Sequence, residues 1–340
     1  YGLGSILPRF LNFLLVRLHT GIFLPDAYGV ITKLFAYVAV VNVVLMFGME
    51  TAYFRYASKS DADEKKIFNI AQTFVVAISL FTALVCLIFA QPIATLLLIP
   101  EHPEYITWLA LILLTDAVVA IPFARLRLQK KALQFAVGKL INIGLLVGLN
   151  LYFLKVVYQE EVGVGYVILA NLLANGFYVL FFSKTLLSWR PVYDGQLNPT
   201  MMRYAYPIMI TGLAGMTNEM FSRVTLEWWL PANFYPGQSA EYALGVFGAC
   251  FKFAVLMNLV VQAFRYAAEP FFFTNAHDKS SPALFARVNH YFVIVCCLLL
   301  LSVSINLDIL KHFLKREEYW DGLNIVPVLL LAYLFLGVYY

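Results

Sequence analysis

Charged residues are scarce in this sequence of 340 residues. Asp, Glu, Lys and Arg together make up 13% of it, whereas an ordinary soluble domain has about 25%. Hydrophobic residues make up 61%, which is more than a soluble fold of this length can bury, so the excess must face lipid. The formal net charge of +4 is too small for a protein that binds a nucleic-acid backbone. The composition excludes a soluble enzyme, a disordered chain and a nucleic-acid module.

Motifs for catalysis and metal binding are also missing. The sequence has no HExxH zinc motif, nucleophile elbow, P-loop or glycine-rich dinucleotide loop after a strand. Its four cysteines lie in apolar segments without CxxC spacing, where a free cysteine usually acts as a small buried hydrophobic residue. We therefore expect no enzyme, no cofactor and no metal site.

Long apolar segments are the main feature that is present. A helix that crosses a membrane needs about 20 mostly apolar residues, and such segments cover residues 3–24, 28–48, 68–90, 105–123, 136–154, 162–182, 204–226, 243–264, 287–306 and 323–340. A chain in lipid must satisfy its backbone hydrogen bonds internally, so these ten segments predict an all-α, polytopic transmembrane helical bundle. Because the sequence begins at Tyr1 and stops within an apolar segment, we expect a piece of a longer protein.

Basic residues are distributed unevenly between the loops. One set of alternate loops holds 15 Lys and Arg residues, with Lys139 counted among them, and the other set holds four. Positively charged loops stay in the cytoplasm, so the richer side and the N-terminus are predicted to be cytoplasmic. The polar loop around Trp189 predicts a linker at 184–202, which separates an N-terminal lobe at 1–183 from a C-terminal lobe at 203–340.

The start of the second lobe is similar to the start of the chain. Pro8 and Pro207 open the first and seventh spans, and Lys33 and Lys252 lie in the second and eighth. An even number of spans separates the two copies, which gives them the same orientation, as in transporters built from parallel repeats. The repeat predicts two related lobes of a six-helix type around a central cavity, with the second lobe truncated.

One small-residue pattern predicts close helix packing. Gly144-Leu-Leu-Val-Gly148 lies in the fifth span. Small residues four apart let two membrane helices approach closely, so we expect a helix contact at this position.

Charged residues inside the spans carry the functional prediction. A charge at the centre of a spanning helix costs about 2.5–3.5 kcal/mol on insertion scales, so it usually faces a cavity or a partner. The basic ones fall only on the first, second, seventh and eighth spans, as Arg9, Arg17, Lys33, Arg223 and Lys252. Guanidinium and ammonium groups around a cavity favour an anionic substrate such as a phosphate. The alternatives are snorkelling to lipid phosphates for Arg9, Arg17 and Lys33 and a local ion pair for Arg223 with Glu219.

Asp116 and Glu219 are the deepest acidic residues in the spans. A buried carboxylate can carry H⁺ or Na⁺ in a coupled transporter, so both residues are candidates for ion coupling. Asp116 can also join two helices by a hydrogen bond. The amide side chains inside the spans are expected to join helices in the same way, among them Asn142, Asn171 and Asn175.

Several segments carry a resemblance to a known family. They are the opening Tyr1-Gly-Leu-Gly-Ser-Ile-Leu-Pro-Arg-Phe, then Gly48-Met-Glu-Thr-Ala-Tyr-Phe-Arg55, then Asn218-Glu219 with Arg223, and Gln262-Ala-Phe-Arg-Tyr-Ala-Ala-Glu-Pro-Phe-Phe-Phe273. Together they resemble the polysaccharide-type flippases of the multidrug/oligosaccharidyl-lipid/polysaccharide exporter superfamily. The segment from Gln262 to Phe273 looks like the branch that serves lipopolysaccharide biosynthesis.

The resemblance implies a flippase of the bacterial inner membrane. Its substrate would be an oligosaccharide, such as an O-antigen repeat unit, on undecaprenyl diphosphate. Alternating access would move this lipid from the cytoplasmic to the periplasmic leaflet, with H⁺ or Na⁺ as a candidate coupling ion. The implied partners are the lipid bilayer, a polysaccharide polymerase and glycosyltransferases.

Three other functions remain open from the sequence. A cation-coupled multidrug exporter of the same fold would favour acidic over basic residues in its cavity. A lipid II flippase differs only in the sugar that it moves. A membrane glycosyltransferase or polymerase would need a larger outer loop than residues 226–242.

Overall fold

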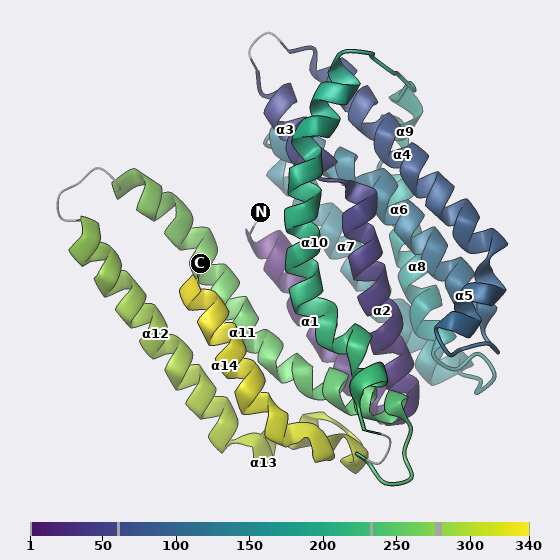
Figure 1. Cartoon of the computed structure of the whole chain (residues 1–340), viewed down its shortest axis with the longest axis vertical. Helices are drawn as coiled ribbons and strands as arrows, with labels where there is room; N and C mark the ends of the chain where they lie inside the picture. The colour runs from purple at the N-terminus through teal and green to yellow at the C-terminus, as the bar shows by residue number, and fades with distance from the viewer. Residues whose placement is uncertain (1, 60–61, 232–233, 276–280, 340) are drawn as a thin grey trace. The chain divides into compact units, whose positions relative to one another are not determined.

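The computed structural model of this chain describes residues 2–59, 62–231, 234–275 and 281–339. The side chains of residues 2–10, and several of those between 266 and 281, lie outside this description. Within the described ranges the secondary structure is helical and holds no strand (Figure 1). The predicted all-α helical bundle is therefore confirmed.

Each predicted span falls on a helix of the described chain. These helices are α1 (Gly2–Ile22), α2 (Pro25–Met46), α4 (Glu64–Ile88), α6 (Pro103–Leu128), α7 (Ala132–Tyr152), α8 (Gly165–Phe181), α10 (Leu197–Trp229), α11 (Ala240–Asn275), α12 (Ser281–Ile305) and α14 (Val326–Tyr339). Shorter elements lie between them, namely α3 (Met49–Ala57), α5 (Ala90–Leu96), η1 (Phe153–Val157), α9 (Ser183–Ser188), α13 (Leu307–Leu310), η2 (Lys311–Phe313) and η3 (Glu317–Ile325).

The helices differ in how well they suit a lipid environment. Seven of those in the described chain are long and apolar enough to cross a membrane, and α1 and α8 add shorter apolar helices at Leu11–Ile22 and Gly165–Phe181. Helix α10 has 33 residues but does not qualify, because it is too polar. The chain is thus a multi-pass membrane protein in which one long helix stands apart by its polarity.

The backbone contacts divide the chain into two compact units. Unit 1 is Lys33–Leu226, and unit 2 combines Gly2–Thr32 with Glu227–Tyr340. The units do not follow chain order, because α1 groups with α11 to α14, and most of α10 groups with α3 to α9. The lobes at 1–183 and 203–340 remain a prediction from the sequence.

Unit 1 is built around α4, α6 and α8. Helix α6 packs along both α4 and α8, and α7 packs along α8. The side chains of Tyr53, Phe68, Val75 and Ile121 are among those fully buried in this core. These helices are rich in Val, Ile, Leu and Phe on every side, as expected when one face of a helix meets protein and the other meets lipid.

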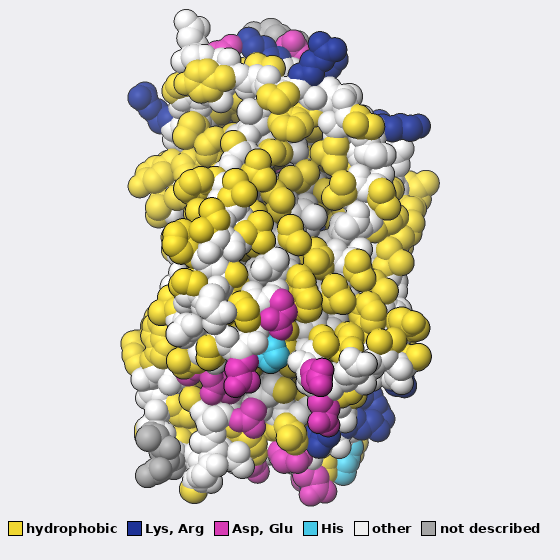
Figure 2. All heavy atoms as spheres, turned by 90° about the vertical axis from the view of Figure 1, so that its right-hand side faces the viewer, with side chains coloured by type: hydrophobic (Ala, Val, Ile, Leu, Met, Phe, Trp, Pro, Cys, Tyr) yellow, Lys and Arg dark blue, Asp and Glu magenta, His cyan; other side chains and the backbone are white. Residues whose placement is uncertain are grey.

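The two ends of unit 1 carry opposite kinds of charge. The end formed by the α3–α4, α6–α7 and α8–α10 connections, called the basic end below, holds Arg55, Lys59, Lys65, Lys66, Arg125, Arg127, Lys130, Lys131, Lys184 and Arg190. The opposite end, around the α5–α6 and α7–α8 connections and the first turn of α6, holds Glu101, Glu104, Glu160 and Glu161 together with Lys155. Figure 2 shows a broad apolar belt between a group of Lys and Arg side chains and a group of Asp and Glu side chains. The belt is the surface that faces lipid.

Ion pairs join the helices at the basic end. Glu64 accepts hydrogen bonds from Tyr53 at 2.5 Å and from Arg125 at 2.8 Å, and Glu50 pairs with Arg127. Both arginines also lie over aromatic rings, with the guanidinium of Arg125 4.6 Å from the centre of the Phe68 ring. The acids of this end are thus held by neighbouring cations.

Unit 2 contains a helix crossing in which two backbones touch. Gly29 on α2 and Gly245 on α11 face each other so closely that a Cβ atom at Gly245 would collide with the backbone oxygen of Pro25. A Cβ atom at Gly29 would likewise collide with the backbone oxygen of Glu241. Only glycine permits so close an approach of two helices.

The small-residue pattern of α7 makes no such contact. A Cβ atom added at Gly144 or at Gly148 would meet no atom within 4 Å. The expected close contact at Gly144 and Gly148 is therefore wrong for the described structure. In this helix the glycine that lies against a neighbour is Gly138, whose added Cβ would lie 3.1 Å from the ring of Phe181.

Candidate functional site

Helix α10 carries polar side chains along its length within unit 1. Thr211, Thr217, Asn218, Ser222 and Arg223 all lie between Leu197 and Leu226. Polar side chains in a membrane face a cavity, water or protein, because lipid cannot form hydrogen bonds with them. The polarity that keeps α10 from qualifying as an apolar span therefore identifies it as a wall of a polar space.

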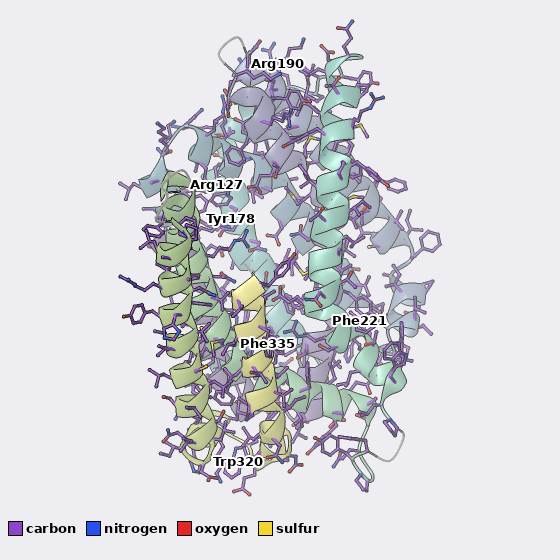
Figure 3. All side chains as sticks on the ribbon, turned by 60° about the vertical axis from the view of Figure 1, so that its left-hand side comes forward. Arg127, Tyr178, Arg190, Phe221, Trp320 and Phe335 are labelled. Carbon is purple, nitrogen blue, oxygen red and sulfur yellow. The ribbon has the colours of Figure 1, made fainter. Side chains whose placement is uncertain are left out.

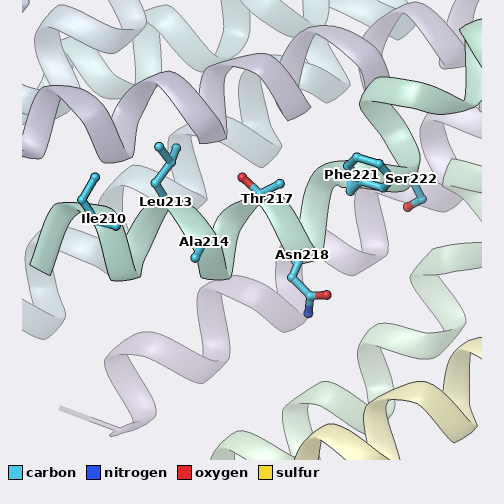
Figure 4. Close-up of a pocket in the computed structure, with 7 residues that line it drawn as sticks. All are labelled: Ile210, Leu213, Ala214, Thr217, Asn218, Phe221 and Ser222. Atoms are coloured by element: carbon cyan, nitrogen blue, oxygen red, sulfur yellow. The ribbon is translucent and has the colours of Figure 1, made fainter. Parts of the chain in front are cut away.

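One face of α10 borders a groove of about 700 Å³. Its lining residues are Ile210, Leu213, Ala214, Thr217, Asn218, Phe221 and Ser222 (Figure 4). They recur with the spacing of three and four residues that places side chains on the same face of a helix. The groove is apolar at its Ile210 end and becomes polar from Thr217 to Ser222, so it can contact both an apolar and a hydrogen-bonding part of a ligand.

The start of α10 is fixed to α4 by polar contacts. The carboxylate of Asp194 pairs with Lys66 at 2.7 Å and accepts hydrogen bonds from the backbone N–H groups of Gln196 and Leu197. The backbone N–H of Val192 donates to the hydroxyl of Thr73 at 3.1 Å. Asp194 therefore caps α10 and ties its first turn to the basic end.

Helix α10 runs antiparallel to α2. Gly48 lies against the backbone oxygen of Ala205, and five residues earlier Val43 lies against Gly212. Gly48 adopts φ of +70° at the bend between α2 and α3, a conformation that suits glycine. The two helices lie side by side in Figure 1.

This register bears on two of the predicted cations. Lys33 lies ten residues before Val43 on α2, and Ser222 lies ten residues after Gly212 on α10. Ten residues of helix span about 15 Å, so two helices that kept this register would bring Lys33 towards the level of Ser222 and its neighbour Arg223. Lys33 is 2% exposed, and Arg223 is partly buried. A shared site for the two cations remains a prediction from the sequence.

Arg223 and Glu219 lie one turn apart on α10. The guanidinium of Arg223 donates to the backbone oxygen of Glu219 at 3.4 Å and lies 2.7 Å from the sulfur of Met220. The side chain of Glu219 is exposed. Figure 3 labels Phe221, which lies between them in the sequence.

The other predicted cations belong to unit 2. Arg17 is exposed on α1, and Lys252 is partly buried on α11. Arg9 lies on α1, but its side chain is outside the described part of the chain. The proposal that all five cations share one cavity remains a prediction from the sequence.

A second polar cluster surrounds Asp116 between α6, α7 and α8. The side-chain nitrogen of Asn175 donates to Asp116 at 2.9 Å and to the oxygen of Asn171 at 3.2 Å. Asn142 donates to the side-chain oxygen of Asn175 at 3.2 Å and to the backbone oxygen of Ala174 at 2.8 Å. The predicted hydrogen bonds between spans are therefore present, and they converge on a single carboxylate.

Lys139 belongs to this cluster rather than to a loop. Helix α7 begins at Ala132, so Lys139 lies two turns inside it, and its charge interacts with that of Asp116. Its ammonium lies 4.3 Å from the ring centre of Phe123 and 5.0 Å from that of Tyr178, where cation–π attraction favours it. The sequence places basic residues of the spans only on the first, second, seventh and eighth spans and counts Lys139 with a loop. This is wrong, because Lys139 lies inside α7.

Comparison with known protein families gives a match to the polysaccharide biosynthesis protein family over residues 15–233. The chain belongs to this family. The match covers α2 to α10 in full, and with them the Asp116 cluster and the α10 groove. No curated protein sequence matches the chain significantly.

Two solved structures share the fold of this member of the polysaccharide biosynthesis protein family. One is an inward-facing multidrug resistance MATE family transporter of the MOP superfamily, with a TM-score of 0.65 and 14% identity over 97% of this chain and 81% of that one. The other is the MATE multidrug transporter DinF-BH, with a TM-score of 0.67 and 13% identity over 99% of this chain and 78% of that one. At these identities the likeness shows the fold alone.

Proposed function

We propose that the protein is a flippase for an oligosaccharide on undecaprenyl diphosphate, which it moves from the cytoplasmic to the periplasmic leaflet by alternating access. The observation that carries the proposal is a polysaccharide biosynthesis family match on a chain with a transporter fold. Polysaccharides outside the cell are assembled from lipid-linked units, so a membrane protein of this family has a lipid-borne sugar as its natural cargo.

The cations supply the chemistry for a diphosphate. Arg223 follows Ser222 of the α10 groove, and Lys33 is proposed to act with it, because a guanidinium together with an ammonium binds phosphate oxygens well. Arg17, Lys252 and Arg9 are proposed to contribute further positive charge. The polar end of the groove offers Thr217, Asn218 and Ser222 as hydrogen-bonding groups for sugar hydroxyls, while the prenyl chain stays in lipid.

The membrane potential can assist this movement. In a cell with a negative interior, an anion that crosses the whole field outward gains about 2.3 kcal/mol per charge per 100 mV. A diphosphate carries more than one negative charge, so a coupling ion is not required on energetic grounds. Asp116 and Glu219 are proposed as coupling residues for H⁺ or Na⁺ if transport depends on either gradient.

The second candidate function is export of organic cations, as in the multidrug transporters that share the fold. Such a protein needs acidic residues where cargo binds. In unit 1 the α10 groove ends at Ser222 next to Arg223 in the sequence, and Glu219 is the acid of this part of α10. The balance of charge at the groove therefore favours an anionic cargo.

The proposal places the protein in a bacterial inner membrane with its N-terminus in the cytoplasm. The basic end of unit 1 would face the cytoplasm, in agreement with the distribution of Lys and Arg. Glycosyltransferases that make the lipid-linked oligosaccharide and a polymerase that consumes it are the proposed partners.

A double substitution tests the proposed function. The variant Arg223→Gln with Lys252→Gln should abolish surface glycan in cells while the protein remains in the membrane at the native level. A matched control, Lys65→Gln with Lys130→Gln, removes the same charge from the basic end and should leave the glycan intact. Full glycan in the first variant contradicts the cationic site. Normal glycan in cells that lack the protein, together with lost resistance to organic cations, identifies an exporter instead.

A further inference from the structure

A pocket of about 470 Å³ opens at the basic end of unit 1, apart from the α10 groove. It lies where α6 ends, α7 begins and α8 continues into α9. Its lining residues are Pro122, Arg125, Leu126, Gln129, Lys131, Gln134, Phe181, Phe182, Lys184 and Thr185. All of them belong to unit 1, and this space is called the basic pocket below.

Aromatic packing gives the basic pocket a firm floor. The ring of Phe123 packs edge to face against Phe182 at 4.7 Å and against Phe135 at 5.5 Å between ring centres. Phe182 is itself buried and lines the pocket. The three helices are thus joined directly beneath the pocket, which preserves its shape when it is empty.

The charge of the lining is positive. Arg125, Lys131 and Lys184 are the charged side chains among the lining residues, and Gln129, Gln134 and Thr185 add hydrogen-bond donors. Arg125 is fixed by its hydrogen bond to Glu64 at 2.8 Å, whereas Lys131 and Lys184 are exposed. A group of cations and amides around a concave space is a site for an oxyanion, above all a phosphate.

The basic pocket lies at the depth of lipid headgroups. Helix α6 has 26 residues, which corresponds to about 39 Å, so its ends extend beyond a hydrocarbon core of about 30 Å. Arg125 is three residues from the end of α6, Lys131 immediately precedes α7, and Lys184 is the second residue of α9. All three cations are therefore within about one turn of a helix end.

Exposed leucines lie close in the sequence to the lining residues of the basic pocket. Leu133, Leu180 and Leu187 are 77%, 74% and 86% exposed, and each lies within three residues of a lining residue. Large apolar side chains exposed to this extent in a membrane protein contact acyl chains. A cationic pocket bordered by apolar surface matches a molecule with a phosphate at one end and hydrocarbon at the other.

We propose that the basic pocket binds the headgroup of an anionic glycerophospholipid from the surrounding leaflet. The phosphate contacts Lys131, Lys184 and Arg125, and the acyl chains lie along Leu133, Leu180 and Leu187. Pockets lined by basic residues between membrane helices favour anionic headgroups. The site does not depend on the proposed flippase activity, because its lining residues belong to α6, α7, α8, α9 and the connections between them, and none belongs to α10.

The test uses the purified full chain and measures retained lipid by native mass spectrometry. The native protein should bind phosphatidylglycerol in preference to phosphatidylcholine. Lys131→Gln with Lys184→Gln should bind phosphatidylglycerol about 10- to 30-fold more weakly, because each basic residue near a membrane surface contributes roughly a factor of five. The control Lys65→Gln with Lys130→Gln should bind it as the native chain does.

Two further arms distinguish a pocket from general charge, and a lipid from free phosphate. Gln134→Phe fills the basic pocket without changing its charge and should weaken phosphatidylglycerol binding as the double variant does. Glycerol phosphate alone should bind at least 10-fold more weakly than the lipid, since it lacks the acyl contacts. Equal binding of the two phospholipids, native binding by either pocket variant, or equal binding of glycerol phosphate overturns the proposal.

Discussion

The side-chain nitrogen of Asn175 on α8 donates a hydrogen bond to the carboxylate of Asp116 on α6 at 2.9 Å. With Asn142 and Lys139 on α7, this contact links three helices through one acid. A carboxylate inside a membrane protein is costly unless it is hydrogen bonded and faces a positive charge. Asp116 has both, so the cluster satisfies a polar group in the interior of unit 1.

Two substitutions of Asp116 separate a structural role from ion coupling. Asp116→Asn keeps an acceptor for Asn175 but removes the charge that faces Lys139, so it should lower the melting temperature in detergent less than a substitution that also removes the acceptor. Asp116→Leu leaves Asn175 without this acceptor and should destabilise unit 1 by about 1–3 kcal/mol. If Asp116 couples transport to an ion, Asp116→Asn abolishes the dependence of flipping on an imposed H⁺ or Na⁺ gradient in proteoliposomes. Unchanged ion dependence in that variant assigns the cluster to structure alone.

Lys33 should matter for transport more than other lysines do. Lys33→Gln removes a buried charge, and we expect the flipping rate in proteoliposomes to fall at least tenfold, because a charge-assisted hydrogen bond contributes about 1.5–3 kcal/mol. Lys65→Gln, at an exposed position of the basic end, should flip at the native rate. An equal loss in both variants shows that total charge, rather than the position of Lys33, sets the rate.

Two glycines should respond to alanine in opposite ways. Gly245→Ala places a methyl group against the backbone oxygen of Pro25, which cannot rotate away, so unit 2 should lose stability by several kcal/mol or fail to fold. Gly144→Ala adds a methyl group where no atom lies within 4 Å, and it should stabilise α7 by about 0.5–1 kcal/mol. Thermal unfolding of both variants in one detergent measures the difference. A stable Gly245→Ala variant contradicts the backbone contact.

Asp194 should stabilise the protein in a pH-dependent way. The ammonium of Lys66 and the N–H groups of Leu197 and Gln196 lower the pKa of Asp194 to about 2. The folded state thus favours the ionised carboxylate. The ionised carboxylate of Asp194 contributes fully to the free energy of unfolding above the ordinary aspartate pKa of about 3.9. This contribution is lost as the pH falls towards 2. The melting temperature of Asp194→Ala should lie below that of the native chain at pH 6, and the gap should narrow below pH 4.

Asp194→Asn provides the matched control for this effect. Asparagine can still cap α10, but it forms no ion pair with Lys66. Its melting temperature should lie between those of the native chain and Asp194→Ala, and its difference from the native chain should vanish at low pH. A difference that persists unchanged at pH 3 assigns the effect to a contact other than the carboxylate charge.

The helices could be predicted from the sequence because apolar length is a direct requirement of the bilayer. The neighbours against which each helix packs could not be predicted from the sequence. The glycines of α7 fit the pattern for helix contact, yet the backbone contact lies at Gly29 and Gly245, which are far apart in the sequence. Spacing within one helix says where a close approach is sterically permitted, and only the fold determines which neighbour comes near.

Some residues of the candidate site could be predicted from the sequence, because a charge inside an apolar segment is conspicuous. Charge inside apolar segments identified Lys33, Arg223 and Asp116, since each is costly in lipid. Lys139 was missed because it follows several loop lysines, and the start of α7 at Ala132 moves it inside a helix. The register between α2 and α10 depends on contacts at Gly48 and Gly212. No pattern in the sequence predicts these contacts.

The opposite charges at the two ends of unit 1 have an electrical consequence. Most Lys and Arg residues of unit 1 lie at one end, where they outnumber the acids, and Glu residues outnumber Lys at the other, so the unit has a permanent dipole along the direction in which it crosses the bilayer. With the basic end on the negative side of an energised membrane, this dipole lies along the field. Turning the molecule over would require work against the resting potential. In the proposed orientation, the membrane potential therefore opposes inversion of the chain in addition to the cost of moving its basic loops through lipid.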